Sequence, residues 1–187
     1  MDHYVDLKLR PDPEISQPHL MGALLSKLHL TLVAQRSGHI GISFPAVQDA
    51  PPWLGDRLLL HGNQAELAAM MATSWLAGMR DHVQASAVLP VPPTARFRVV
   101  SRVQAKSNPD RLRRRQIRRH GIDAAEALER VPDSAAERLD LPYVQLRSLS
   151  TVQSFKLFIR HGVLQDTANP GVFGAYGLSP TATVPWF

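Results

Sequence analysis

The sequence predicts an α+β protein, and three features of it support that class. Some segments alternate apolar and polar residues as strands do, others repeat apolar residues at helical spacing, and a proline-rich stretch separates two groups of such segments. Residues 1–94 read strand–helix–strand and then strand–helix, which favours a ferredoxin-like, RNA-recognition-like domain. Residues 95–187 predict a smaller domain with an arginine-rich helix over 109–120 and a β-hairpin.

The first half begins with a half-buried strand, because Val5, Leu7 and Leu9 alternate with charged residues. A helix is expected from Pro18 to near Gly38, where glycine favours a stop. The remaining strands and helices are predicted from the same two spacings of apolar residues, alternation for a strand and three to four residues for a helix. A proline-stiffened linker ends this first half of the chain. These segments are a strand over 40–44, a loop over 49–52, a strand over 57–61, a helix over 64–71 with a further turn or two over 74–82, and the linker over 89–93.

The second half opens with a strand over 97–103, again by alternation. Asn108 suits the N-cap of the arginine-rich helix, Pro109 its first position, and Gly121 its left-handed stop. Asp123, followed three residues later by glutamate, resembles a capping box for a short helix. Two strands, 143–149 and 155–160, are expected to form the hairpin.

The composition of the 187 residues limits the chemistry. The formal charge is +5 and the isoelectric point about 10.1, which points to a polyanionic partner; the alternative is a basic surface that serves solubility alone. The absence of cysteine excludes disulfides, iron–sulfur clusters, thiolate nucleophiles and cysteine-bound zinc. The N-terminus is acidic and alternating, and no apolar run approaches a membrane span, so we expect a cytoplasmic protein with no signal peptide and no membrane partner.

The segment 109–120 is the most informative stretch of the chain. At about 100° per residue, five of its arginines fall within one arc of roughly 140°, whereas Arg113 points elsewhere and Ile117 is expected to pack inward. Neighbouring like charges destabilise a free helix, so an anionic partner must offset their repulsion, and each guanidinium can fork onto phosphate oxygens or a guanine edge. The stripe predicts nucleic-acid binding by Arg111, Arg114, Arg115, Arg118 and Arg119.

Other interpretations of this stripe remain open. A solvated helix face is one, although such faces usually mix both signs of charge, and a lipid-binding face is another, although the opposite side is not richly apolar. A DNA-binding regulator would use the same helix for recognition and would be expected to dimerise. The arginines do not distinguish DNA from RNA, but the RNA-recognition-like first half favours RNA.

The polar residues around this helix resemble a known family. The run 101–109 leading into the arginines, Arg147 and Ser148 leading to Phe155, the N-terminal segments 2–4 and 9–13, and the terminal 184–187 are similar to the CRISPR repeat-processing endoribonucleases of subtype I-F systems. The resemblance spans essentially the whole chain and is most specific from 102 to 119. It implies a repeat-RNA hairpin as substrate, cleavage at the 3′ base of its stem, retention of the product, and the other subunits of an interference complex as partners.

Such a reaction needs no cofactor and no metal, because RNA carries its own nucleophile, the 2′-hydroxyl. The sequence also lacks a convincing set of converging acids for a two-metal nuclease. His29 directly follows Leu28, the last residue of an apolar row that begins at Leu24, so its side chain points away from the centre of that row. Most histidines in helices have a structural role. The resemblance nevertheless implies that His29 is the general base. The resemblance also implies that Ser148 holds the ribose of the scissile nucleotide and that Tyr176 lies near the site, in a C-terminal segment that Pro180 stiffens.

The remaining site residues are expected to contact RNA. Arg102 and Gln104 share one face of a strand, and their side chains suit guanine and adenine; in the family these positions read the bottom of the stem. The resemblance favours stacking of Phe155 on the base that closes the hairpin; otherwise it is a buried hairpin aromatic. Lys106, Ser150 and Thr151 complete the predicted interface. A non-catalytic protein that only holds a hairpin would share these residues but would not need His29.

Overall fold

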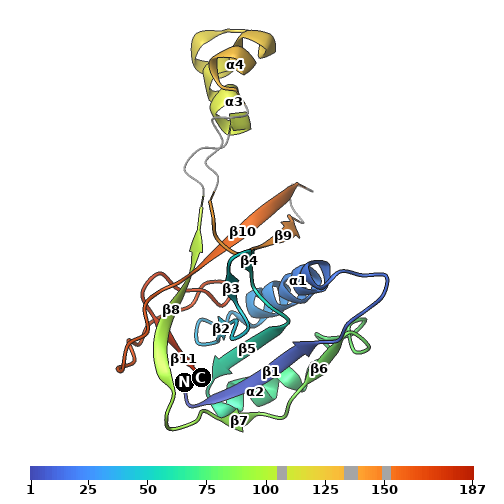
Figure 1. Cartoon of the computed structure of the whole chain (residues 1–187), viewed down its shortest axis with the longest axis vertical. Coiled ribbons are helices and arrows are strands. Elements are labelled where there is room, and N and C mark those ends of the chain that lie inside the picture. Colours follow the sequence, from blue (N-terminus) through green and yellow to red (C-terminus); the bar gives the residue numbers. More distant parts are fainter. Residues whose placement is uncertain (105–108, 133–138, 149–152) are drawn as a thin grey trace. The chain divides into compact units, whose positions relative to one another are not determined.

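A computed structural model gives the structure, and it describes residues 1–104, 109–132, 139–148 and 153–187 (Figure 1). The protein mixes helices and sheets, as the α+β prediction requires. Contacts group the chain into two compact units, residues 1–102 with 141–187, and residues 103–140. Residue 94 lies within the first unit, so these units do not follow the expected boundary. The division into 1–94 and 95–187 stays a prediction, since a grouping by contacts does not test separate folding.

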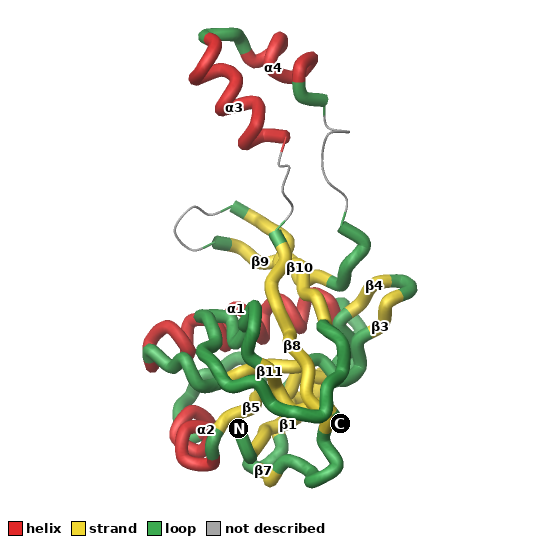
Figure 2. Tube along the Cα trace, turned by 90° about the vertical axis from the view of Figure 1, so that its left-hand side faces the viewer, coloured by secondary structure: helices red, strands yellow, loops and turns green. Residues whose placement is uncertain are grey.

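The first sheet has the strand order β2-β5-β1-β6, with β7 pairing beside β1 (Figure 1). Figure 2 labels β5, β1 and β7 of this sheet in a second view. The strand pairs of the sheet are antiparallel, and the register sets Val5 opposite Leu60 and Leu7 opposite Leu58. All four side chains are buried, so the alternation in the sequence does mark the face of the sheet that builds the core. The strands are β1 (His3–Leu9), β2 (Gly41–Ser43), β5 (Arg57–Gly62), β6 (Val83–Ala85) and β7 (Leu89–Pro90).

Two helices belong to this sheet, α1 (Gln17–Gln35) and α2 (Gln64–Met71). The bounds of α2 match the prediction. Helix α1 ends at Gln35, close to the expected stop near Gly38, but its left-handed C-cap is Arg36, with φ 50°, and not the glycine. The expected helical extension over 74–82 is wrong, because this segment forms separate hydrogen-bonded turns.

Two segments that the sequence predicts as irregular contain short strands. Within the expected loop 49–52, β3 (Gln48–Asp49) pairs with β4 (Pro52–Trp53) as a small hairpin. Within the expected linker 89–93, β7 pairs with the start of β1. Both segments contain proline, which argues against a strand in a sequence because proline is tolerated only at sheet edges and strand ends. The two short strands were therefore not predicted.

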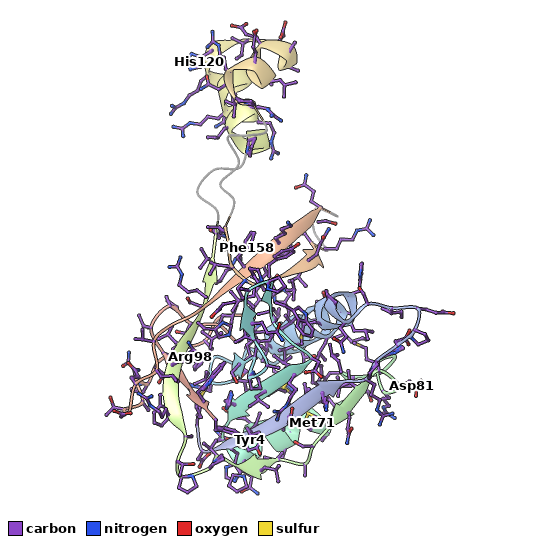
Figure 3. The ribbon with its side chains drawn as sticks, viewed as in Figure 1. Tyr4, Met71, Asp81, Arg98, His120 and Phe158 are labelled. Atoms are coloured by element: carbon purple, nitrogen blue, oxygen red, sulfur yellow. The ribbon has the colours of Figure 1, made fainter. Side chains whose placement is uncertain are left out.

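The second sheet has the order β11-β8-β10-β9 and contains the predicted hairpin. The last strand of the chain was not predicted, because it contains Pro185, which an edge strand accommodates. The guanidinium of Arg98, labelled in Figure 3, lies 4.4 Å from the ring centroid of Trp186 on the neighbouring strand. The strands are β8 (Arg96–Val103), β9 (Tyr143–Arg147), β10 (Ser154–His161) and β11 (Thr183–Trp186).

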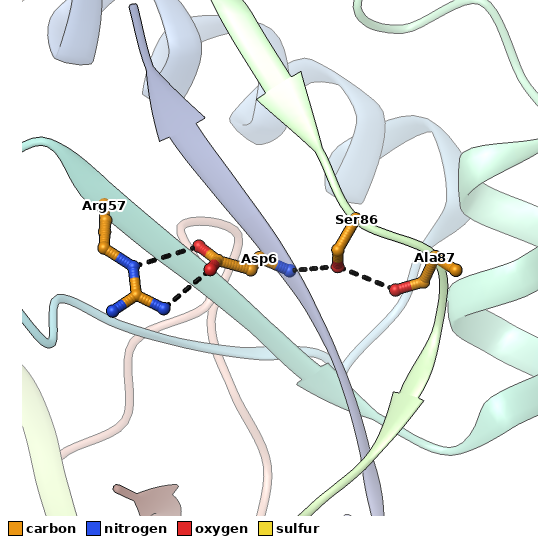
Figure 4. Close-up of polar contacts among 4 residues, drawn as sticks. All are labelled: Asp6, Arg57, Ser86 and Ala87. Carbon is orange, nitrogen blue, oxygen red and sulfur yellow. Dashed lines mark hydrogen bonds and ion pairs between the residues drawn. The ribbon is translucent and has the colours of Figure 1, made fainter.

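Helix α1 contacts both β1 and β9, and all of its leucines except Leu30 enter the hydrophobic core. The approach to β9 is close, because a Cβ at Gly22 would lie 2.8 Å from the carbonyl oxygen of Gln145. On β1, Asp6 accepts hydrogen bonds from the guanidinium of Arg57, the shorter 2.6 Å, and its backbone N–H donates to Ser86 Oγ (Figure 4). These contacts link β1 to β5 on one side and to the residue that follows β6 on the other.

The second unit contains α3 (Pro109–His120) and α4 (Ala124–Arg130), which pack against each other. Gly121 ends α3 with φ 65°, as predicted. Asp123 caps α4 by accepting a hydrogen bond from the backbone N–H of Glu126, at 2.8 Å. The expected N-cap of α3, Asn108, lies outside the described residues. In the described part of the chain, no helix is long and apolar enough to cross a membrane.

Candidate active site and nucleic-acid interface

His29 lies at the edge of the hydrophobic core, as its phase on α1 predicts. Leu28 is fully buried and Leu30 is exposed, while His29 between them is half-buried. Its Nδ1 lies 2.9 Å from the carbonyl oxygen of Ala175. Because a carbonyl can only accept, Nδ1 carries the hydrogen, and in the neutral ring Nε2 holds the lone pair. His29 is therefore set up to accept a proton at Nε2.

Tyr176 fixes the plane of that imidazole. The two rings stack with centroids 4.1 Å apart and an angle of 8° between their planes. The phenol ring is itself half-buried and packs against the core. The turn that presents it closes through a hydrogen bond from the N–H of Gly177, whose φ is 69°, to the carbonyl of Gly174. One short turn thus supplies both groups that orient His29.

The turn is supported from the segment that follows it. Ser179 is buried, its N–H donates to the carbonyl of Val100 on β8, and its Oγ accepts from the N–H of Ala182 at 3.0 Å. These bonds tie the segment around Pro180 to the second sheet. The position of Tyr176 therefore depends on pairing across the fold and not only on the turn itself.

Ser148 lines the same pocket as His29 and Tyr176. The pocket has a volume of about 550 Å³ and is also lined by Ser26, Leu30 and Phe155. Ser148 directly follows β9, and its backbone N–H donates to the carbonyl of Gln153 at 2.9 Å, which continues the hairpin pairing. The predicted catalytic residues His29, Ser148 and Tyr176 are thus brought together from three distant parts of the sequence.

Arg102 meets Phe155 beside this pocket. The guanidinium carbon of Arg102, on β8, lies 5.9 Å from the ring centroid of Phe155, on β10, within the range of a cation–π contact. Phe155 is half-buried and packs against the core, and its stacking on an RNA base stays a prediction. Arg102 is exposed, as is Gln104 just after the strand ends.

Helix α3 presents most of its charge to solvent. Arg113 differs from the other arginines, as predicted, because its Nε donates to the carbonyl of Val131 at 2.8 Å. The expectation that Ile117 packs inward is not met, since 37% of its surface is exposed. Arg113 and Ile117 lie four residues apart on the same side of the helix, and the bond of Arg113 to Val131, the C-cap of α4, leaves Ile117 partly exposed there. The exposed arginines are Arg114, Arg115, Arg118 and Arg119.

Some predicted contacts cannot be placed. Lys106, Ser150, Thr151 and the side chain of Arg111 lie outside the described residues. The carbonyl of Ala175 carries no local signal in the sequence. The close approach of α1 to β9 at Gly22 carries one weak signal, a glycine inside a leucine-rich helix. Within the described ranges, no cluster of three histidine, aspartate or glutamate side chains is arranged to hold a metal ion.

Comparison with known proteins agrees with the resemblance noted in the sequence. Residues 4–187 match the family described as CRISPR-associated protein (Cas_Csy4). The chain is 54% identical over 187 residues to the CRISPR-associated endonuclease Cas6/Csy4 of Pseudomonas aeruginosa (strain UCBPP-PA14), and 49% identical to the protein of that name from Escherichia coli (strain UTI89 / UPEC). Both alignments cover all of each chain. The chain therefore belongs to the Cas_Csy4 family, the repeat-processing endoribonucleases of type I-F CRISPR systems.

Proposed function

We propose that this protein is an endonuclease that processes CRISPR RNA, and that it cuts the repeat hairpin at the 3′ base of the stem without a metal ion. One observation carries the proposal. His29, held at Nδ1 by a backbone carbonyl and stacked on Tyr176, shares a pocket with Ser148. Full-length relatives at 54% and 49% identity, both named endonucleases, support the reaction class.

The proposed reaction uses the 2′-hydroxyl of the scissile nucleotide. His29 Nε2 takes the hydroxyl proton, and the 2′ oxygen attacks the adjacent phosphorus. The bond from phosphorus to the 5′ oxygen breaks, that oxygen takes up a proton from water as it leaves, and His29 returns its proton to solvent. The products are a 2′,3′-cyclic phosphate and a 5′-hydroxyl. The hydroxyl of Ser148 holds the ribose so that attack and departure lie in line. No residue forms a covalent bond to the RNA.

Recognition of the hairpin is assigned to two surfaces. The exposed arginines of α3 bind the phosphates of the stem, and Arg102 with Gln104 read base edges at its bottom. Phe155 stacks on the closing base, and the cation–π contact with Arg102 is consistent with a joint role. The predicted contributions of Lys106, Arg111, Ser150 and Thr151 stay predictions. Retention of the product and assembly with other subunits of the interference complex belong to the same proposal.

We also propose that residues 1–94 form a ferredoxin-like domain and that α3 is the arginine-rich helix of an RNA-binding C-terminal domain. The strand order β2-β5-β1-β6 supports the first assignment, because β1 and β5 are the two central strands. Helix α1 follows β1 and helix α2 follows β5, as in a ferredoxin-like domain. The sequence of α3, with its exposed basic face, supports the second.

The test uses a labelled hairpin from the protein's own repeat, incubated in EDTA. We expect cutting at the base of the stem, with a cyclic phosphate on the 5′ fragment. His29→Ala should abolish cutting, since general-base catalysis contributes roughly 10²–10⁴-fold, yet leave hairpin affinity nearly unchanged. Equal cutting by both proteins would remove His29 from the mechanism. Tight binding without cutting would make the protein a hairpin-holding subunit.

A further inference from the structure

The turn that orients His29 docks on an edge of the first sheet. Strand β2 is the last in the strand order and pairs with β5 along one side. On its other side, the backbone N–H of Ile42 donates to the carbonyl of Gly177 at 2.9 Å, so the turn satisfies a backbone group that an edge strand would leave unpaired. Ala175 and Tyr176, which hold the imidazole, directly precede Gly177. The contact with β2 therefore lies next to the groups that orient the proposed general base.

The approach of the turn to β2 requires a glycine at position 177 for two separate reasons. A Cβ at Gly177 would lie 2.7 Å from Cγ2 of Ile42, whereas two carbon atoms in contact are about 3.5–4.0 Å apart. The φ of Gly177 is 69°, a backbone conformation that residues with a side chain rarely adopt. The second requirement concerns the turn alone. The first concerns the fit between the turn and the first sheet, and it is the one that bears on the active site.

Ile42 has little freedom to move away from such a Cβ. Its side chain is fully buried in the hydrophobic core, and the register of β2 sets it opposite Leu60 on β5. A β-branched side chain has few χ1 rotamers, and a close-packed core leaves little space for the others. A Cβ at position 177 would therefore push the turn away from β2 by about 1 Å, the step from 2.7 Å to an ordinary carbon–carbon contact.

We infer that Gly177 is a positioning residue: its fit against Ile42 sets where the Ala175 carbonyl meets His29. The inference rests on the proposed function, in which His29 takes the proton of the 2′-hydroxyl. Gly177 acts through the two residues that precede it and is assigned no contact with the RNA. A shift of the turn by about 1 Å would break the 2.9 Å bond to Nδ1, and a misplacement of that size can slow a reaction about a hundredfold.

The experiment substitutes Gly177 in the full-length protein and measures chemistry and binding separately. In single-turnover cleavage of the repeat hairpin, Gly177→Ala should cut about ten- to a hundredfold more slowly than the wild type. The affinity for a hairpin whose scissile nucleotide is 2′-deoxy, which prevents cutting, should stay unchanged. The reason is that the arginines proposed to bind the stem lie on α3, whereas the turn docks on β2.

Gly78 provides a matched control. Its φ is 77°, close to that of Gly177, but no atom of the described residues lies within 4 Å of a Cβ built on it. Gly78→Ala therefore introduces the same kind of backbone strain without a new contact. Both alanine variants should lower the melting temperature, and only Gly177→Ala should slow the cut. A loss of stability alone would not produce this difference.

A second substitution tests the contact with Ile42 directly. Ile42→Leu removes Cγ2, the atom that the new Cβ would meet, and keeps the volume of the side chain. Alone it should cut at nearly the wild-type rate, and combined with Gly177→Ala it should recover most of the lost rate. Gly177→Asn serves if Gly177→Ala does not fold, because asparagine tolerates a positive φ but still carries a Cβ. It should slow the cut, and Ile42→Leu should again restore it.

The tautomer of His29 reports its positioning without any reaction. While the Ala175 carbonyl holds the neutral ring, the hydrogen lies on Nδ1, and nitrogen NMR of isotope-labelled histidine distinguishes this form from the one with the hydrogen on Nε2. The wild type and Gly78→Ala should show the Nδ1–H form at a pH where the ring is neutral. Gly177→Ala should show a mixture of the two forms.

The outcomes separate this inference from the function on which it rests. A Gly177→Ala variant that cuts as fast as Gly78→Ala, or that keeps the Nδ1–H form, would overturn the inference while His29→Ala still abolishes the cut. A double variant that recovers no activity would assign the loss to the turn alone and overturn the role of Ile42. If the wild type did not cut the hairpin, the proposed function would fail, and the inference would fail with it.

Discussion

The imidazole of His29 lies parallel to the phenol ring of Tyr176, 4.1 Å away and at an angle of 8°. The carbonyl of Ala175 holds the same imidazole through Nδ1. Stacking sets the plane of the ring, and the hydrogen bond sets its rotation within that plane. Two neighbouring residues therefore determine where Nε2 lies, and such positioning is what the proposed general base would need.

The ring of Tyr176, and not its hydroxyl, is expected to matter for this positioning. Tyr176→Phe keeps the stack and should cut at nearly the wild-type rate. Tyr176→Ala removes a stacking interaction worth about 0.5–1.5 kcal/mol, so the cleavage rate should fall roughly 2- to 13-fold. Single-turnover cleavage with saturating protein measures this rate directly. A large loss in Tyr176→Phe would instead assign the hydroxyl a role at the phosphate.

The exposed arginines of α3 are expected to act in binding and not in chemistry. Arg115→Ala and Arg119→Ala should each weaken hairpin affinity and lower the slope of log Kd against log salt by roughly 1 for each phosphate that the variant no longer binds. The cleavage rate of bound RNA should change little. Arg80→Ala is a matched control, because Arg80 is also exposed but lies outside this helix. An unchanged affinity in both α3 variants would rule out this helix as the surface that binds the hairpin.

Two histidines are expected to make stability depend on pH. Burial lowers the pKa of His61 to about 3, and burial together with nearby Arg98 lowers the pKa of His161 to about 4. The ordinary value is 6.5, so below it the unfolded chain binds protons that the folded chain excludes. The free energy of unfolding should therefore fall as pH decreases from 6.5 toward 4, by about 1.4 kcal/mol per pH unit for each such proton.

Thermal unfolding between pH 7.5 and 4.5 measures this dependence. His161→Gln should reduce the slope, because the half-buried ring is replaced by a group that does not titrate. His39→Gln is the control, since His39 is exposed and lies outside the buried pair. A wild-type slope that His161→Gln leaves intact would assign the pH dependence to other groups, His61 first among them.

The sequence predicts helices and strands well where their apolar residues recur at one regular spacing. The bounds of α2 agree with the prediction, and β1, β5 and β8 agree to within two residues, because each carries a clear apolar pattern. Strands of two to four residues that contain proline, such as β4 and β11, were not predicted. Their pairing depends on partners elsewhere in the chain, and a local pattern does not encode those partners.

The site divides in the same way. The phase of His29 on its helix places it at the edge of the core, and family resemblance adds Ser148 and Tyr176. The carbonyl that fixes the imidazole could not be predicted. A backbone carbonyl has no residue-specific signal, and its contact with His29 joins two residues that lie far apart in the sequence.

Gly22 tests how strictly the packing of α1 on β9 sets the active site. Helix propensity alone predicts that Gly22→Ala stabilises the protein by about 1 kcal/mol. The structure predicts the opposite sign, because the new Cβ would lie 2.8 Å from the carbonyl oxygen of Gln145, a backbone atom of β9 that cannot rotate away. Helix and strand must then separate, at a cost of roughly 1–3 kcal/mol.

The same separation should slow the chemistry, since α1 carries His29 and β9 leads to Ser148. Gly22→Ala should therefore lower both the melting temperature and the single-turnover cleavage rate. Ala23→Gly is the matched control: it lies on the exposed side of the same turn, so it should cost about 1 kcal/mol of helix stability without slowing the cut. A melting temperature above that of the wild type in Gly22→Ala would show that β9 yields, and the helix–strand packing would then not be what holds the two residues together.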